Sequence, residues 1–529
     1  MNRKRLEKEK TKNQKQKEEK QNMAHRNSVK KNGEPKVIEL NLSATVAVII
    51  AIIVLIVTVT SVKVITTIIV ADENKKMNND TQAANERVTY VNSTLKDESG
   101  NIVNETDSEG NVIQVPVPKG YSASKIEGET TASKGFVIYE GDVDWSTILV
   151  DSGSTQSNVA IDEPAFDDDL VVINENMPES NIVQDANDDE NTAEDATAND
   201  DTTTDTTTPT QEEINIFNLQ KTRNQYVWVP VDDPSRIYGV DSKGKIWGKL
   251  YSFSSTGRTA NNWTETNGIM SITSQTYYRD PNVLQSTTYD RDGYSYMHSS
   301  GLGETRYEML AQELEQNYYG IIESIKKYGG FYIGRYETGG LNGTAVVRKM
   351  DTNIANQNWY TMYKKCLTLK GTNTDVKTSM IFGNLWDETL EWLVKSGATI
   401  SDGTALTYQL IANNSTTWGN YYYATFNYIS ANAETPLMTE TKAKSKRTII
   451  PAGSAEYTKA NNVYDMAGNV EEWTTEAYST SYRVYRGGGY YYDDSYISPS
   501  FQRLTAAASI RLAATTSSAD GCRCVLWIK

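Results

Sequence analysis

The chain has 529 residues, which is enough for two or three domains. Its net charge of −16 argues against a nucleic-acid partner, because the phosphate backbone carries the same sign. Only two histidines occur, His25 and His298, so a site built from three histidines is excluded.

A basic tail and one apolar run open the chain. Residues 1–37 hold thirteen Lys and Arg against five Glu. Residues 40–62 then carry no charge, and 64–71 continue the apolar run. At about 1.5 Å per residue, this length covers a hydrocarbon core roughly 30 Å thick. The sequence therefore predicts a cytoplasmic tail at 1–39 and one transmembrane helix at 40–71, with the remainder of the chain outside the cell.

Two alternatives exist for the apolar run. A cleaved signal peptide would be shorter and would be followed by a small-x-small cleavage site, which is absent. Glu39 precedes the run as in a pilin, but the Gly-Phe-Thr junction of pilins is missing. The basic tail is most simply a solvated arm that faces anionic lipids.

Two segments of different composition follow and are predicted to form a stalk. The first, 72–145, contains apolar runs at 88–91, 112–117 and 135–139, with Gly-Asn turns between them. A small β module and an unfolded piece of stalk fit it equally. The second, 146–214, lacks Lys and Arg and is rich in Asp and Thr, which predicts a disordered acidic linker rather than a metal-binding segment.

The outer domain is predicted at 215–529, with an α+β fold. A strand pattern at 224–231 opens it, and apolar residues recur at helical spacing over 304–328. Two shorter helices are expected at 358–367 and 387–395, and a strand at 331–337. The C-terminal third reads as strand and loop, dense in Gly, Tyr, Ser and Thr.

The C-terminal third also carries a specific set of spaced motifs. Residues 461–473 read NNVYDMAGNVEEW, 483–489 read RVYRGGG, and 521–525 read GCRCV. This order resembles the formylglycine-generating enzyme, or sulfatase-modifying factor, family, over about 224–529. Weaker matches lie at 330–338, 363–366 with 387–392, and 418–420. The resemblance implies a C-type-lectin-like fold.

The resemblance also implies a structural calcium ion at the 465–472 turn. Its ligands would be the carboxylates of Asp465 and Glu472 and the carbonyls of Gly468 and Val470, all hard oxygen donors that suit calcium. The alternative is that Asp465 caps a turn and Glu472 faces solvent. Glu471 stands where the family usually has Trp, which indicates a reshaped surface.

Three cysteines occur in the chain, Cys366, Cys522 and Cys524. Cys366 and Cys524 match two family cysteines that pair with one another, and an extracellular location permits that disulfide. Cys522, where the family has Phe, would be left as a free thiol. Three reduced, buried thiols are the alternative.

The catalytic signal of the family is missing. Active members carry a cysteine pair shortly before the final Gly-x-Arg-Cys, and use it to bind copper(I). Here 501–511 contains no cysteine, and Ala506, Ala507 and Ala508 cannot supply the soft ligands that copper(I) needs. The sequence therefore indicates a pseudoenzyme without copper. Hydrolysis would rest on His298 alone, whereas a carboxylate pair acting on carbohydrate stays open.

A tyrosine-rich stretch at 490–496 is the candidate ligand-binding surface. Tyr offers rigid amphipathic contact area, as in antibody paratopes. The candidate residues are Tyr490, Tyr491, Tyr492, Asp493, Asp494 and Tyr496. The stretch also resembles the hypervariable C-termini of retroelement-diversified lectin-fold proteins. A merely soluble tyrosine-rich loop is the alternative.

These observations favour one function over two others. The favoured one is a binding protein, anchored by one helix in a bacterial cell membrane, whose outer domain holds a protein or glycan ligand. The alternatives are a divergent oxidase or other enzyme on the same fold, and a structural cell-surface protein. The fold alone does not decide among them.

Overall fold

The computed structural model describes residues 87–150, 208–240, 246–249, 251–260, 264–266, 269–272, 275–278, 306–340, 343–352, 357–412, 415–477, 482–491, 509–512 and 520–529. The chain divides into two compact units, Met1–Ala83 and Ala84–Lys529, and all described residues belong to the second. The tail, the predicted transmembrane helix and most of the acidic linker lie outside the described residues. Within the described part, no helix is long and apolar enough to cross a membrane.

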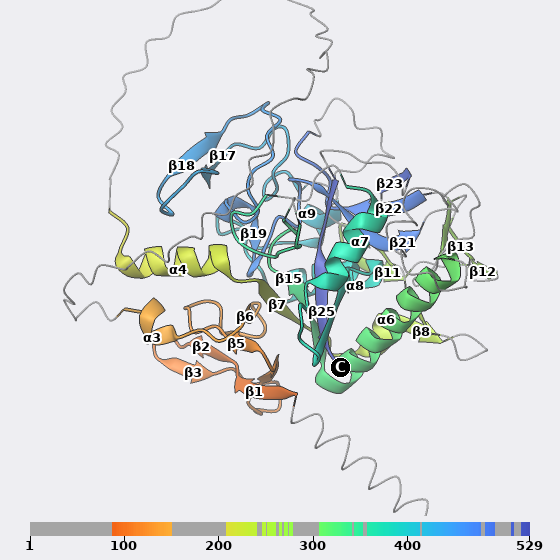
Figure 1. Cartoon of the computed structure of the whole chain (residues 1–529), viewed down its shortest axis with the longest axis horizontal. Coiled ribbons are helices and arrows are strands. Elements are labelled where there is room, and N and C mark those ends of the chain that lie inside the picture. Colours follow the sequence, from red (N-terminus) through yellow and green to blue (C-terminus); the bar gives the residue numbers. More distant parts are fainter. Residues whose placement is uncertain are drawn as a thin grey trace, which may run out of the picture. The chain divides into compact units, whose positions relative to one another are not determined.

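An antiparallel sheet of six strands forms the centre of the second unit (Figure 1). Its order is β16-β25-β15-β7-β6-β5, with every neighbouring pair antiparallel. The strands are β5 (Tyr121–Ala123), β6 (Val137–Glu140), β7 (Gln225–Pro230), β15 (Gly330–Gly334), β16 (Val376–Met380) and β25 (Cys524–Ile528). Every residue of β15 and β25 is buried, so this sheet is covered on both faces at its centre.

Side-chain alternation along these strands divides the core in two. Trp228, Tyr332 and Leu526 belong to one apolar cluster, while their chain neighbours, such as Val227 and Val525, belong to the other. This is the period of two expected when successive side chains point to opposite faces of a sheet.

Three helices pack against the sheets. They are α6 (Arg306–Tyr328), α7 (Trp359–Thr368) and α8 (Gly383–Lys395). Helix α6 contacts β15 and β25, α7 contacts β16, and α8 contacts β7. The Asn358 side chain caps α7 by accepting a hydrogen bond from the Thr361 amide, and Gly329, with φ of 78°, follows the end of α6. The three predicted helices are therefore confirmed, with their boundaries moved by a few residues.

A second sheet carries the C-terminal motifs. Its strands follow the order β12-β13-β14-β21-β22-β23, with β24 parallel to β21. They are β12 (Thr264–Thr266), β13 (Ile269–Ile272), β14 (Gln275–Tyr278), β21 (Glu471–Ala477), β22 (Tyr482–Arg486), β23 (Ser509–Leu512) and β24 (Asp520–Cys522). The described part thus has an α+β fold, as expected.

The remaining elements are hairpins and short helices. The strand pairs are β1 (Val88–Asn92) with β4 (Gln114–Pro118), β2 (Thr94–Lys96) with β3 (Ile102–Asn104), β8 (Tyr238–Val240) with β9 (Ile246–Gly248), β10 (Tyr251–Ser254) with β11 (Gly257–Ala260), β17 (Phe426–Ile429) with β18 (Thr439–Lys442), and β19 (Lys459–Ala460) with β20 (Val463–Tyr464). The helices are α3 (Trp145–Ile148), α4 (Gln211–Thr222), α9 (Tyr408–Ala412), and the 3₁₀ turns η1 (Pro234–Arg236) and η3 (Glu456–Thr458).

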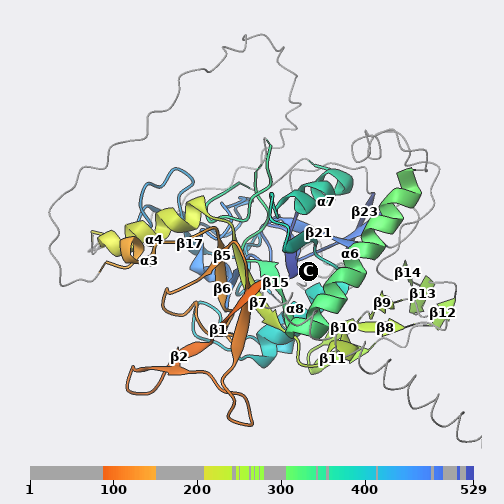
Figure 2. The ribbon, with the colours of Figure 1, turned by 60° about the horizontal axis from the view of Figure 1, so that its bottom comes forward.

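The segment expected to form a stalk contributes directly to the main sheet. Strand β6 pairs with β7 through Val137 opposite Val227, and β5 forms the sheet edge beyond β6 (Figure 2). The Asn215 side chain, on α4, donates a hydrogen bond to the Thr147 carbonyl at 3.0 Å. The division predicted at residue 215 therefore cuts through one sheet, and the two ends of the acidic segment meet at α3 and α4.

Candidate functional site

The 465–472 segment begins as a turn with three residues in the left-handed region. Asp465, Gly468 and Asn469 have φ values of 59°, 76° and 62°. The Gly468 amide donates to the Gly487 carbonyl at 3.0 Å, and the Asn469 amide donates to the Asn420 carbonyl at 3.0 Å. A Cβ on Gly468 would lie 2.4 Å from the Asn420 carbonyl oxygen, so this position requires glycine.

The Asp465 carboxylate is buried and bound by donors of the chain. One oxygen accepts from the Gly453 amide at 2.7 Å, and the other accepts from the Thr458 hydroxyl at 2.6 Å. Burial raises the pKa of Asp465, while these hydrogen bonds oppose the rise. Asp465 therefore holds the entry of the turn to the η3 region.

Glu472 forms a buried, two-pronged ion pair with Arg523. The Arg523 Nε and Nη2 atoms lie 2.9 and 2.5 Å from the Glu472 oxygens, and both side chains are fully buried. Arg523 also donates to the Gly334 and Tyr464 carbonyls, at 3.0 and 2.9 Å. Burial raises the pKa of Glu472 to about 7, while Arg523 opposes that shift.

A third carboxylate, Glu337, closes this group. Its oxygens accept from the Val470 amide at 3.1 Å and from the Asn469 side-chain amide at 2.7 Å. Burial, together with the charges of Asp465 and Glu472, raises the pKa of Glu337 well above its usual range. We call Glu337, Asp465, Glu472 and Arg523 the turn cluster.

The turn cluster does not fit calcium as it is arranged. Arg523 occupies the Glu472 carboxylate, and Thr458 and Gly453 occupy that of Asp465, so a dication would have to displace these donors and lie beside a buried guanidinium. No group of three or more His, Cys, Asp or Glu side chains in the described ranges is placed to hold a metal ion. Calcium binding by Asp465, Gly468, Val470 and Glu472 therefore rests on the family resemblance alone.

The three cysteines are buried in the core and are unbridged in the structure. The Cys366 and Cys522 sulfurs lie 3.6 Å apart, while Cys524 accepts a hydrogen bond from the Thr338 hydroxyl at 3.7 Å. Burial, followed by the neighbouring thiols, raises the pKa of Cys366 well above its usual range, which makes it a poor nucleophile. The pairing of Cys366 with Cys524 stays a prediction, and the geometry adds Cys522 as a second candidate partner.

The tyrosine-rich stretch begins next to the 465–472 turn. The Tyr490 amide donates to the Asn469 carbonyl at 2.9 Å, and the Tyr491 hydroxyl donates to Glu471 at 2.6 Å. The two rings are 5.4 Å apart and nearly perpendicular. Glu471 itself is fully buried. It therefore holds Tyr491 from within the core and is not itself part of the surface. Tyr492, Asp493, Asp494 and Tyr496 lie outside the described residues.

Sequence reasoning missed the residues that complete the turn cluster. Arg523 and Glu337 come from the Gly-x-Arg-Cys end and from the segment after β15. Both lie in segments that match the family's motifs, at 521–525 and 330–338. Their motif positions were a usable signal, because a carboxylate-rich turn in a core requires a cation.

Comparison with known families decides what this segment is. Residues 385–527 match the family model of the sulfatase-modifying factor enzyme 1-like domain. This stretch is a sulfatase-modifying factor enzyme 1-like domain. It contains Asp465, Glu472 and Arg523, while Glu337 and Cys366 precede it and pack into the same core.

Several solved structures are similar to this chain. The crystal structure of CarF is 14% identical, with a TM-score of 0.24, over 38% of this chain and 87% of that one. PvdO from Pseudomonas aeruginosa is 12% identical, with a TM-score of 0.21, over 38% and 82%. Treponema denticola variable protein 1 is 13% identical, with a TM-score of 0.19, over 58% and 96%. No curated protein matches the chain.

Proposed function

We propose that this chain is a ligand-binding protein that uses a sulfatase-modifying factor-like scaffold without the oxidase chemistry. The observation that carries the proposal is the hydrogen bond from Tyr491 to the buried Glu471. It orients a partly exposed aromatic ring at the start of the 490–496 stretch. A ring held in place before binding loses less entropy when a ligand arrives, which is how rigid aromatic anchors gain affinity.

The cysteine inventory argues against the oxidase. The sequence has three cysteines, and all of them are buried in the core of the domain. None falls in 501–511, so that stretch has no thiolate with which to hold copper(I). The chain is therefore proposed to act as a pseudoenzyme.

The location of the protein belongs to the same proposal. The uncharged run at 40–62 and the basic tail before it support a single membrane anchor with the tail inside the cell. The outer domain would then face the exterior of a bacterial cell and hold a protein or glycan there.

The binding test uses the full chain in detergent, probed against an array of glycans and purified extracellular proteins. A ligand found there should lose about 2 kcal/mol of binding free energy with Tyr491→Ala. Tyr491→Phe, which keeps the ring and loses only the hydroxyl, should cost less. The melting temperatures of both variants should stay close to that of the parent. A ligand whose affinity survives Tyr490→Ala and Tyr491→Ala together would place the site elsewhere.

The enzyme alternative has its own test. The protein is incubated with copper(I), oxygen and a cysteine-containing sulfatase peptide, and aldehyde on the peptide is measured by mass spectrometry. We expect none. Copper-dependent formation of an aldehyde on the peptide would show that the protein is an oxidase and not a pseudoenzyme.

A further inference from the structure

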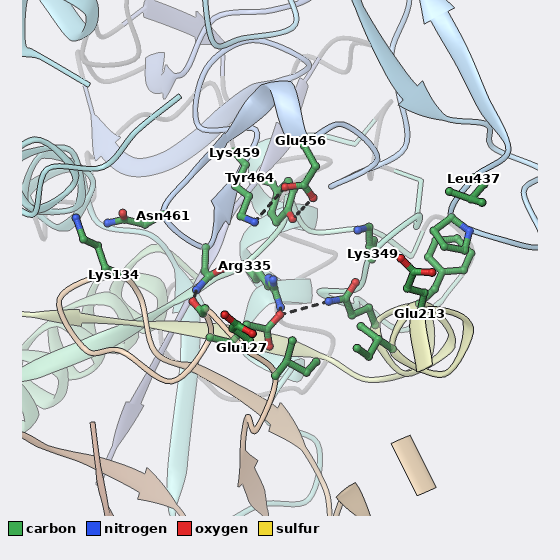
Figure 3. Close-up of a pocket in the computed structure, with 18 residues that line it drawn as sticks. Glu127, Lys134, Glu213, Arg335, Lys349, Leu437, Glu456, Lys459, Asn461 and Tyr464 are labelled. Atoms are coloured by element: carbon green, nitrogen blue, oxygen red, sulfur yellow. Dashed lines mark hydrogen bonds and ion pairs between the residues drawn. The ribbon is translucent and has the colours of Figure 1, made fainter. Parts of the chain in front are cut away.

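A cavity lies apart from the tyrosine-rich stretch, between segments on either side of the acidic linker. It has a volume of about 420 Å³. Its walls come from the loop after β5, from α4, and from the region of η3 and β20 (Figure 3). Ile126, Phe217 and Leu437 supply apolar surface, and the Tyr464 ring supplies an aromatic one. A volume of this size is within the range of small-molecule sites in proteins.

Most of the charges around this cavity are engaged by the chain itself. Arg335 pairs with Glu129 at 2.7 Å, and Lys459 pairs with Glu456 at 3.0 Å. The Arg335 guanidinium and the Lys459 ammonium are therefore each already neutralised by a carboxylate.

The charges at the rim are engaged as well. The Lys134 ammonium donates to the Ser396 and Gly397 carbonyls. Glu127 pairs with Lys96 at 2.6 Å, and Glu213 accepts from the Thr210 amide at 2.8 Å in a helix cap. The charged side chains at the rim are therefore already engaged within the chain, and we do not expect them to bind a charged ligand.

Lys349 is the exception among these charges. Its side chain is buried, with the residue only 9% exposed, and within the described part of the chain its ammonium makes no hydrogen bond or ion pair. The ammonium lies over the face of the Tyr464 ring, 5.7 Å from the ring centre. Figure 3 places Lys349 between Tyr464 on one side and Glu213 with Leu437 on the other. Burial lowers the pKa of Lys349 to about 8, because water is removed from the charged form, while the charge of Glu456 opposes this shift.

An unpaired ammonium in this position is costly to a folded protein. Buried charges are ordinarily paired or hydrogen-bonded, and one that lacks a direct partner destabilises the fold. Residues in binding sites commonly lower the stability of the folded protein, because they are placed to contact a ligand and not the chain itself. A destabilising lysine that lines a cavity is therefore a candidate ligand-binding residue.

We propose that this cavity binds a small organic monocarboxylate. The carboxylate pairs with Lys349, and the apolar body of the ligand packs against Ile126, Phe217 and Leu437. A dianion is disfavoured, because Glu129 and Glu456 line the same space and, among the described lining residues, Lys349 is the one cation without an ion pair or hydrogen bond. This site shares no residue with 490–496, so it stands or falls independently of the function proposed above.

The test uses three phenyl probes that differ in charge. Phenylacetate is the monoanion, phenylacetamide is its neutral counterpart, and phenyl phosphate is the dianion. Thermal melting and titration calorimetry are run on the full chain. We expect phenylacetate to bind and to raise the melting temperature. Phenylacetamide and phenyl phosphate should do so much less. To allow for the shape of the ligand body, N-acetylphenylalanine and its amide serve as a second matched pair.

Two variants assign any binding to this cavity. Lys349→Met should lower the affinity for phenylacetate about tenfold or more, because a charge-assisted hydrogen bond is lost. It should also melt higher than the parent without ligand, which a merely structural lysine would not do. Leu437→Trp, at a side chain that is 47% exposed, should fill the cavity and abolish binding without disturbing the core. Lys326→Met, at an exposed lysine paired with Glu323 on α6, is the matched control and should bind normally.

The outcomes that overturn the proposal are equally specific. One is that neither phenylacetate nor N-acetylphenylalanine binds the parent protein at millimolar concentration. The other is that either binds Lys349→Met as well as it binds the parent.

Discussion

The turn cluster and the Lys349 cavity both bury charge, and they differ in how completely that charge is balanced. In the turn cluster, Arg523 makes hydrogen bonds to Glu472 and to two carbonyls, and each carboxylate accepts from a donor of the chain. In the cavity, the Lys349 ammonium makes no hydrogen bond or ion pair with any residue that the structure describes, and only the more distant charges of Glu456 and Glu129 favour it. We call the turn cluster a closed network, because its charges are paired within the chain and stabilise the fold. The Lys349 cavity is an open network, because its ammonium can still pair with the charge of a ligand.

The largest expected effect comes from breaking the closed network. Arg523→Met leaves Glu337, Asp465 and Glu472 buried without their cation, and we expect the free energy of unfolding to fall by about 3–5 kcal/mol. Urea unfolding of the purified protein measures it. Adding Glu472→Gln to the same variant should recover part of the loss, because one uncompensated carboxylate is removed. A loss below about 1 kcal/mol would mean that the cluster is not the closed network described above.

The open network predicts a pH dependence in the alkaline range. The pKa of Lys349 is lowered to about 8 in the folded state from 10.5 in the unfolded state, so the folded state binds fewer protons between these values. Stability should therefore rise as pH increases from about 8 toward 10.5, by on the order of 1–3 kcal/mol. Urea unfolding across this range measures the rise, and Lys349→Met should lack it. A parent and a variant with identical slopes would assign the titration to other groups.

Removal of calcium with a chelator tests whether the turn cluster holds this ion. The family resemblance predicts a calcium ion at this turn, whereas Arg523 holds the Glu472 carboxylate that the ion would need. With Arg523 in place, we expect chelator to leave the melting temperature unchanged. A fall that calcium reverses would instead show that the ion displaces the guanidinium.

The difference between local and distant partners explains what could be predicted from the sequence. Helix α6 could be predicted because its apolar residues repeat within the helix itself, and the turn because its motif is contiguous. The partners in the turn cluster could not, since Arg523 lies 51 positions from Glu472. The stalk assignment failed for the same reason. Strand β6 finds its partner β7 beyond the acidic segment, and no local pattern records such a pairing.

The pairing of β6 with β7 gives a small expected effect and the last test of the comparison. The cavity takes Ile126 and Glu129 from before the acidic segment and Phe217 and Gln220 from after it. A specific protease site introduced between residues 162 and 209 would cut the chain between these two groups.

Cleavage there should leave the two fragments associated in gel filtration, although they separate under denaturing electrophoresis. Strand β6 keeps its hydrogen bonds to β7, and the Arg335–Glu129 ion pair crosses the same boundary. The melting temperature should change by no more than a few degrees, and phenylacetate should still raise it if the Lys349 cavity is the site. Separation of the native fragments would show instead that 87–150 is held to the domain only through the chain, as the stalk prediction required.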